Sequence, residues 1–396
     1  MVRGISGLDR VRTFVRSFGP AWVVMIADVD AASILTAAAD GALYGYSLVW
    51  FLLLLVVPLF LIQEAAGRIG VATGKGLGEI IRENYSRRIA LLMSVPMALT
   101  DILSYVAEFT GIAIGFQLLG VAPILSLPVV YVVYLAIVWK RGYTTVERFL
   151  VVFSVVLIVS YAGALFLRGL PPVHEYMYFF WSWKPNFLYL MAATAGAVIM
   201  PFMLFYQTSA TAEKKVKSIW SSRLETLIGA LASEVGMVVI LLATIGLNGA
   251  LIETSSPRQL SLALSFLAGS YAPIVFGVGL VAASFLALVV ISLGSAWGVA
   301  ETIGWGRQRF FWIYLFESLP ALVVPMLFPD LFHLAIDMMV LFVFVLVGPG
   351  VMVGLITRKK RIMGNLSSGL GWSAAYWLSL VLVVASGFIA LAAIFI

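Results

Sequence analysis

The chain has 396 residues, of which 62% are hydrophobic and 11% are charged, and its formal net charge is +6. Because soluble proteins average about 25% charged residues, these charges are too few to cover a water-facing surface, and we predict an all-α polytopic membrane protein. The chain contains no cysteine, which excludes disulfides, thiolate metal sites and cysteine nucleophiles. We interpret the positive charge as the cytoplasmic bias of membrane proteins and expect no nucleic-acid partner.

Long apolar runs, such as residues 47–62 and 378–396, approach the ~20 residues that span a bilayer. We predict eleven such segments in a single transmembrane domain that covers 1–396. In chain order they lie near 19–40, 44–66, 89–119, 121–139, 147–168, 188–212, 224–247, 271–297, 309–328, 331–357 and 370–396.

The basic residues predict the orientation of these segments. If the amino terminus is cytoplasmic, 22 of the 25 Lys and Arg residues fall on the inside, and only Arg168, Lys184 and Arg258 fall outside. An excess of basic residues in cytoplasmic loops is the usual bias. We therefore predict a multi-pass protein of the cell membrane with its carboxyl terminus outside, surrounded by lipid. A monomer is favoured.

Two of the segments are interrupted at matching places. The first carries Asp28 and Asp30 within "ADVDAAS" (27–33), and the sixth carries Pro201 within "AVIMPFM" (197–203). Proline removes a backbone donor and breaks a helix. Broken helices that occur as a pair are typical of inverted-repeat transporters, whose binding site lies near the bilayer midplane. The sequence therefore predicts a first five-helix repeat over 17–168, a second over 188–357, and an additional helix over 370–396.

The carboxylates at the first break need a partner. A charged side chain at the bilayer centre costs roughly 2.5–3.5 kcal/mol on insertion scales, and neither interrupted segment contains Lys or Arg. A bound cation is the natural partner, and oxygen ligands suit hard divalent ions. The alternative is a capping role, because Asp is common at helix N-caps; for Asp30 in particular both roles stay open.

At these residues the chain resembles the Nramp family of divalent-metal transporters. The family carries D-P-G-N in helix 1 and A-x-x-M-P-H in helix 6, where this chain reads "DVDA" (28–31) and "AVIMPF" (197–202). Further similarity lies in "GALYGYSLVWFLLLL" (41–55), "VAEFTGIAIGFQLLG" (106–120) and other stretches in the same order. The resemblance implies a LeuT-like inverted repeat of five and five helices plus an eleventh.

The resemblance also implies a ligand set for the metal. Asp28 matches the metal-binding aspartate, Ala197 the alanine whose carbonyl faces the ion, and Met200 the methionine ligand. Ala31 stands in place of the asparagine ligand and offers only its carbonyl, whereas Asp30 adds an acid. The alternative for Met200 is an ordinary role in core packing.

Two protonatable groups of the family are replaced in this chain. Phe202 stands at the histidine of helix 6, and the acidic pair of helix 3 reads Tyr105 and Glu108. These changes resemble the magnesium-transporting branch of the family, although that branch lacks the methionine retained here as Met200. We expect transport with little or no proton coupling.

Other polar residues predict a path beside the site. Asp101, Tyr105 and Glu108 are spaced to lie on one helix face, which indicates either a hydrated path or a buried network. Glu234 lies within the seventh segment. Phe202 and Gln207 both lie after the second break in the sixth segment. We place these six residues in the polar pathway.

We therefore predict a transporter of divalent cations such as Mg²⁺ or Mn²⁺, working by alternating access. The metal ion is its substrate, and no cofactor is expected. The alternative is transport of an organic amine or amino acid, whose ammonium group would pair with Asp28 and Asp30 and stack on Phe202. An enzyme is not expected, because an intramembrane aspartyl protease needs aspartates on two separate helices.

Overall fold

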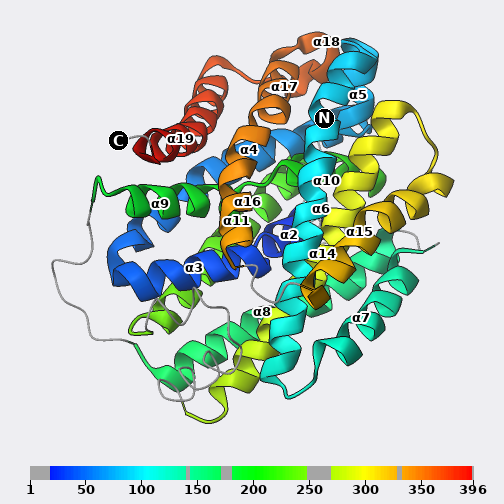
Figure 1. Cartoon of the computed structure of the whole chain (residues 1–396). Helices are drawn as coiled ribbons and strands as arrows, with labels where there is room; N and C mark the ends of the chain where they lie inside the picture. The colour runs from blue at the N-terminus through cyan, green and yellow to red at the C-terminus, as the bar shows by residue number, and fades with distance from the viewer. Residues whose placement is uncertain (1–17, 140–142, 171–180, 248–268, 328–331, 395–396) are drawn as a thin grey trace, which may run out of the picture.

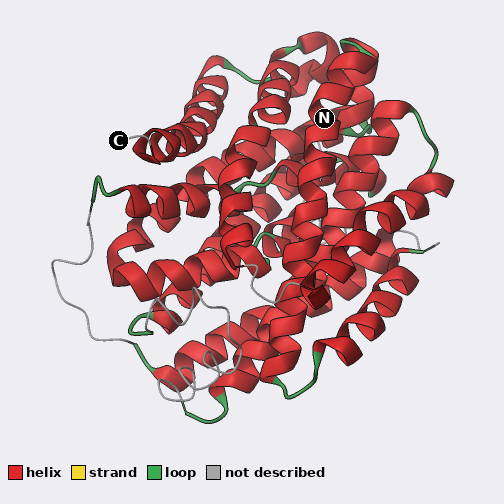
Figure 2. Ribbon diagram, in the orientation of Figure 1, coloured by secondary structure: helices red, strands yellow, loops and turns green. Residues whose placement is uncertain are grey.

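The structure, a computed structural model, describes residues 18–139, 143–170, 181–247, 269–327 and 332–394. The predicted start of the first repeat at 17 and the predicted segment ends at 328, 331 and 396 lie outside these ranges. All regular structure in the described residues is helical (Figure 2), as the composition predicts. The helices are α2 Pro20–Ala27, α3 Ala31–Tyr44, η1 Gly45–Leu48, α4 Val49–Thr73, α5 Leu77–Asn84, α6 Arg87–Leu118, α7 Pro123–Val138, α8 Tyr143–Arg168, α9 Pro185–Val198, α10 Pro201–Glu213, α11 Ile219–Thr244, α14 Ala272–Ile303, η3 Arg307–Arg309, α15 Phe310–Leu327, α16 Phe332–Val345, α17 Val347–Arg358, α18 Lys360–Met363, η4 Gly364–Leu366 and α19 Leu370–Ile394.

Nine helices in the described part of the chain are long and apolar enough to cross a membrane. The expected eleven segments differ at two places. α7 has only 16 residues, and the first segment is divided into α2 and α3, with α3 continuing through η1 into α4. Each expected segment nevertheless corresponds to a helix or to a pair of helices in the structure.

The helices differ in how much of their surface is covered by protein. In α10 every residue from Pro201 to Thr211 is buried, and α2 is buried at seven of its eight residues. A helix that is buried on all sides belongs in the interior of a bundle, and Figure 1 shows α2 near the middle with α7 and α19 at the periphery. Outer helices expose large apolar side chains, for example Ile124 at 67% and Leu378 at 70%. This apolar exterior fits a lipid environment.

The tenth predicted segment is also interrupted, which the sequence reading did not anticipate. α16 ends at Val345 and α17 begins at Val347. Pro349 lacks the amide that would bond to the Val345 carbonyl four residues earlier. The stretch "VGPG" (347–350) was the signal for this interruption. The repeat boundaries at 168 and 188 stay a prediction.

Candidate metal site at the helix breaks

The first break separates α2 from α3 at residues 28–30. Asp30 has extended backbone geometry and is the N-cap of α3, with its Oδ1 accepting a hydrogen bond from the Ser33 amide at 2.7 Å. This contact satisfies one of the amides that a helix start leaves without a partner. The capping role considered for Asp30 is therefore confirmed. Its second oxygen, Oδ2, is buried and has no hydrogen-bond partner among the described residues.

The second break separates α9 from α10. α9 ends at Val198 and α10 begins at Pro201. Helical bonding would pair the Ala197 carbonyl with the amide of residue 201, and proline has none. The Met200 amide instead donates to the sulfur of Met203 at 3.3 Å. The break thus leaves the Ala197 carbonyl available to other groups.

The two breaks are joined by a hydrogen bond. The hydroxyl of Ser33 on α3 donates to the Ala197 carbonyl at 3.2 Å. The carboxyl ends of α2 and α9 both lie at these breaks, and the carboxyl end of a helix carries partial negative charge. Converging ends of this kind, with unwound carbonyls, favour a cation.

Four buried carboxylates surround the junction. Asp28 Oδ2 accepts a hydrogen bond from Ser233 of α11 at 3.2 Å, and Asp28 also lies within electrostatic range of Asp30 and Glu234. Glu108 of α6 accepts the Ala31 amide at 3.2 Å and interacts with Asp30. All four side chains are at most 1% exposed.

The described residues bring no positive charge to this junction. None of the ion pairs in the described residues includes any of the four carboxylates. Within the described residues no donor bonds to Asp28 Oδ1, Asp30 Oδ2, Glu108 Oε1 or either oxygen of Glu234, and the carboxyl groups of Asp30 and Glu108 lie within hydrogen-bonding reach of each other. Unpaired charge buried this deeply is strongly unfavourable, so the junction requires a cation, protons or both. The described residues do not, however, gather three or more His, Asp or Glu side chains into one ready-made metal cluster.

The other predicted ligands are placed as follows. Met200 is fully buried as the N-cap of α10 and follows Ala197 by three residues in the sequence. Ala31 begins α3, so its carbonyl points along the helix axis, and its amide is the group that contacts Glu108. The roles of Met200 and of the Ala31 carbonyl as ligands stay predictions.

The predicted polar stripe on α6 divides between two regions. Glu108 belongs to the break junction, whereas Tyr105 donates to Glu317 of α15 at 3.3 Å, and Asp101 lies near the same glutamate. Between the two predicted alternatives, the contacts of Asp101 and Tyr105 are those of a buried network.

The residues predicted on α10 are buried but differ in their contacts. Phe202 packs against Gly294 of α14, where an added Cβ would lie 3.3 Å from its ring. Gln207 lies beside Gly67 of α4, and neither amide atom of its side chain has a hydrogen-bond partner among the described residues. Their place in a transport pathway stays a prediction.

Sequence reasoning missed three residues that the structure brings to these regions, namely Ser33, Ser233 and Glu317. Asp30 is a common N-cap residue, but nothing local indicated that the Ser33 hydroxyl would contact Ala197, which lies 164 residues away in the sequence. Ser233 had none, because its partner Asp28 lies 205 residues away in the sequence. Glu317 had one, because it is an acid within the predicted apolar segment 309–328, but its partner Tyr105 lies 212 residues away.

Comparison with known proteins decides the family. A family model described as "Natural resistance-associated macrophage protein-like" (Nramp) matches residues 21–393. The chain belongs to the Nramp family. Among its Nramp relatives, the divalent metal cation transporter MntH of Deinococcus radiodurans is 26% identical over 410 residues, covering 97% of this chain and 91% of the relative. MntH of Bacillus subtilis is 26% identical over 412 residues, covering 97% and 92%.

Solved structures of transporters share the fold of this chain. The Eremococcus coleocola manganese transporter, in complex with an aromatic bis-isothiourea substituted compound, superposes with a TM-score of 0.80 at 18% identity, covering 98% of this chain and 88% of that chain. MhsT in complex with L-phenylalanine gives a TM-score of 0.59 at 13% identity, covering 95% and 98%. At these identities the likeness concerns the fold alone, and it confirms the predicted LeuT-like architecture.

Proposed function

We propose that this protein carries divalent metal cations across the cell membrane by alternating access, and that the ion binds at the junction of the two helix breaks. The observation that carries the proposal is the junction itself. Ser33 joins the two breaks through the Ala197 carbonyl, and Asp28 and Asp30 of the first break each keep a buried oxygen without a hydrogen-bond partner among the described residues. The names of the Nramp relatives, which are divalent metal and manganese transporters, support this choice.

Asp28 and Asp30 supply the charge in this proposal. Asp28 Oδ1 and Asp30 Oδ2 are the oxygens left over after their protein hydrogen bonds, so each aspartate can contact an ion without losing its partner. The Ala197 carbonyl adds a neutral oxygen, and Met200 adds a sulfur. Oxygen ligands suit Mg²⁺, whereas a thioether suits softer transition metals. We therefore include both Mg²⁺ and Mn²⁺, and the relatives favour Mn²⁺.

We further propose that metal movement is not strongly coupled to protons. Tyr105 stands where the resemblance implies an acid, and Phe202 where it implies histidine. Neither side chain exchanges protons near neutral pH. The organic-amine alternative is not carried forward, because the curated relatives named above are metal transporters.

Uptake into proteoliposomes tests the proposal. We expect Asp28→Asn to lose most Mn²⁺ and Mg²⁺ uptake, and the exposed connector variant Glu83→Gln to match the unmodified protein. A dye sensitive to pH inside the vesicles should report little acidification during uptake. Full uptake by Asp28→Asn would refute the site, and stoichiometric acidification would refute the weak coupling.

The predicted orientation is tested by labelling. The chain has no cysteine, so single cysteines introduced at Lys75 and Lys184 report on one position each. We expect an impermeant thiol reagent added to intact cells to label position 184 and to spare position 75. The opposite pattern would reverse the orientation.

A further inference from the structure

A second group of buried polar side chains lies between α6, α14 and α15, away from the helix breaks. Glu317 on α15 is its centre. Its Oε2 accepts a hydrogen bond from the Tyr105 hydroxyl at 3.3 Å, and its Oε1 accepts one from the Ser295 hydroxyl at 2.8 Å. Glu317 is 7% exposed, whereas Tyr105 and Ser295 are fully buried. Glu317 therefore joins the neighbouring helix α14 and the distant helix α6, whose Tyr105 lies 212 residues away in the sequence, in one cluster.

Asp101 completes this cluster and is unsatisfied there. Its side chain is fully buried and lies close to both Ser295 and Glu317. The Ser295 hydroxyl has one proton, which it donates to Glu317. Neither oxygen of Asp101 has a hydrogen-bond partner among the described residues. Two charged carboxylates buried side by side are unfavourable unless a cation or a proton lies between them.

The neighbouring helices supply no such charge in the described residues. Arg309 precedes Glu317 by eight residues, which is about 12 Å along a helix, and its guanidinium stacks over the Trp305 ring at 4.9 Å. The groups on α7 and α14 that approach the cluster are neutral hydroxyls: Tyr134 bonds to Ser292 at 2.7 Å and lies near Tyr105. The cluster therefore combines two carboxylates with hydroxyls alone.

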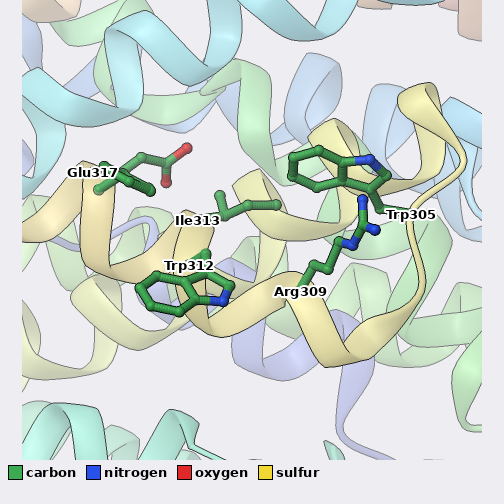
Figure 3. Close-up of a pocket in the computed structure, with 6 residues that line it drawn as sticks. Trp305, Arg309, Trp312, Ile313 and Glu317 are labelled. Carbon is green, nitrogen blue, oxygen red and sulfur yellow. The ribbon is translucent and has the colours of Figure 1, made fainter.

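A pocket reaches this cluster from the outside. It has a volume of about 460 Å³ and is lined by Trp305, Arg309, Trp312, Ile313, Phe316 and Glu317. Figure 3 shows Glu317 at one end, Trp305 with Arg309 at the other, and Ile313 between them. The lining is mostly apolar and includes Arg309, and Trp312 and Phe316 belong to the exposed apolar exterior, so the pocket places Glu317 at the edge of the bundle.

We propose that Asp101 and Glu317 form a second binding site for a hard divalent cation, with Tyr105 and Ser295 as neutral oxygen ligands. The ligand chemistry follows from the donor set, which is oxygen throughout and carries two carboxylates to balance two positive charges. The site is distinct from the helix breaks. Asp101 precedes Glu108 by seven residues, or about 10 Å along α6. The two sites thus share one helix but no ligand.

The number of ions bound per protein tests this proposal. Equilibrium dialysis of the purified full chain in detergent, with Mn²⁺ as the probe, should give two ions per protein. Asp101→Asn and Glu317→Gln should each bind one, Asp28→Asn should bind one, and the exposed control Glu83→Gln should bind two.

The outcomes separate the two sites. If Glu317→Gln and Asp101→Asn bind as many ions as the unmodified protein, the second site is refuted. If they lose one ion while Asp28→Asn loses none, the second site stands and the function proposed for the breaks fails. Should both acid variants fail to fold, Ser295→Ala takes their place; we expect it to weaken the affinity for one of the two ions at least threefold, and an unchanged binding curve would overturn the proposal.

Discussion

A methyl group added at Gly111 tests whether close packing of α6 on α3 positions the first break. Gly111 follows Glu108 by three residues on α6. A Cβ at this position would lie 2.4 Å from the Cβ of Ala31 and 2.4 Å from the Oγ of Ser284. Carbon atoms pack best at about 3.5–4.0 Å, so the start of α3 would have to move by about 1.1–1.6 Å.

A shift of this size would disrupt the break. The Ala31 amide lies 3.2 Å from Glu108 Oε2, and a longer separation takes it outside hydrogen-bonding range. Overpacking costs about 1–3 kcal/mol, and leaving the buried carboxylate without this donor costs about 1–3 kcal/mol more. We expect Gly111→Ala to lower the melting temperature of the purified protein and to weaken Mn²⁺ uptake at least tenfold, since about 1.4 kcal/mol at the site is a factor of ten.

Gly163→Ala on α8 is the matched control. Its added Cβ would meet Val275 at 3.6 Å, which is an ordinary contact. Alanine is favoured over glycine within a helix by roughly 0.5–1 kcal/mol, so this variant should melt at or above the temperature of the unmodified protein. If Gly111→Ala matched Gly163→Ala in both melting and uptake, the argument that this contact sets the geometry of the break would be wrong.

Other substitutions test single contacts. Ser33→Ala removes the hydrogen bond to Ala197, which is worth about 1 kcal/mol, and should reduce the apparent Mn²⁺ affinity about fivefold in uptake assays without loss of folded protein; an unchanged affinity would argue against the bridge. Glu64→Gln removes a 1%-exposed carboxylate that lies 2.7 Å and 3.2 Å from two arginines, and should destabilise the fold by about 3–5 kcal/mol in thermal unfolding. The exposed pair of Lys75 and Glu83, at 2.6 Å, should contribute at most about 1 kcal/mol to the free energy of unfolding. Equal losses of stability in Lys75→Gln and Glu64→Gln would contradict this difference between the exposed and the buried pair. The hydrogen bond from Lys75 lowers the pKa of Glu83. The small stabilisation by this pair is therefore fully present above the ordinary carboxyl pKa and should be lost as the pH falls through the lowered pKa of Glu83. Melting temperatures of the unmodified protein and Glu83→Gln, compared across pH, would show this loss.

Local sequence signals predicted much of the fold and part of the site. Apolar runs identified the spanning segments because lipid requires continuous apolar helices, and Pro201 marked the second break because it has no amide. The aspartates at the first break were found because acids are rare in such segments. The break at Leu346 was missed although "VGPG" (347–350) carried the same kind of signal.

The composition and the order of the chain determined that this protein is a helical membrane protein with two interrupted segments, because these properties depend on each segment and its immediate neighbours. Only the tertiary structure decided which polar groups meet. Ser33 contacts Ala197 across 164 residues, and Tyr105 contacts Glu317 across 212. The spacing that places Asp101, Tyr105 and Glu108 on one face of α6 could not show that they serve different regions, because the helices packed against that face decide which partner each side chain reaches.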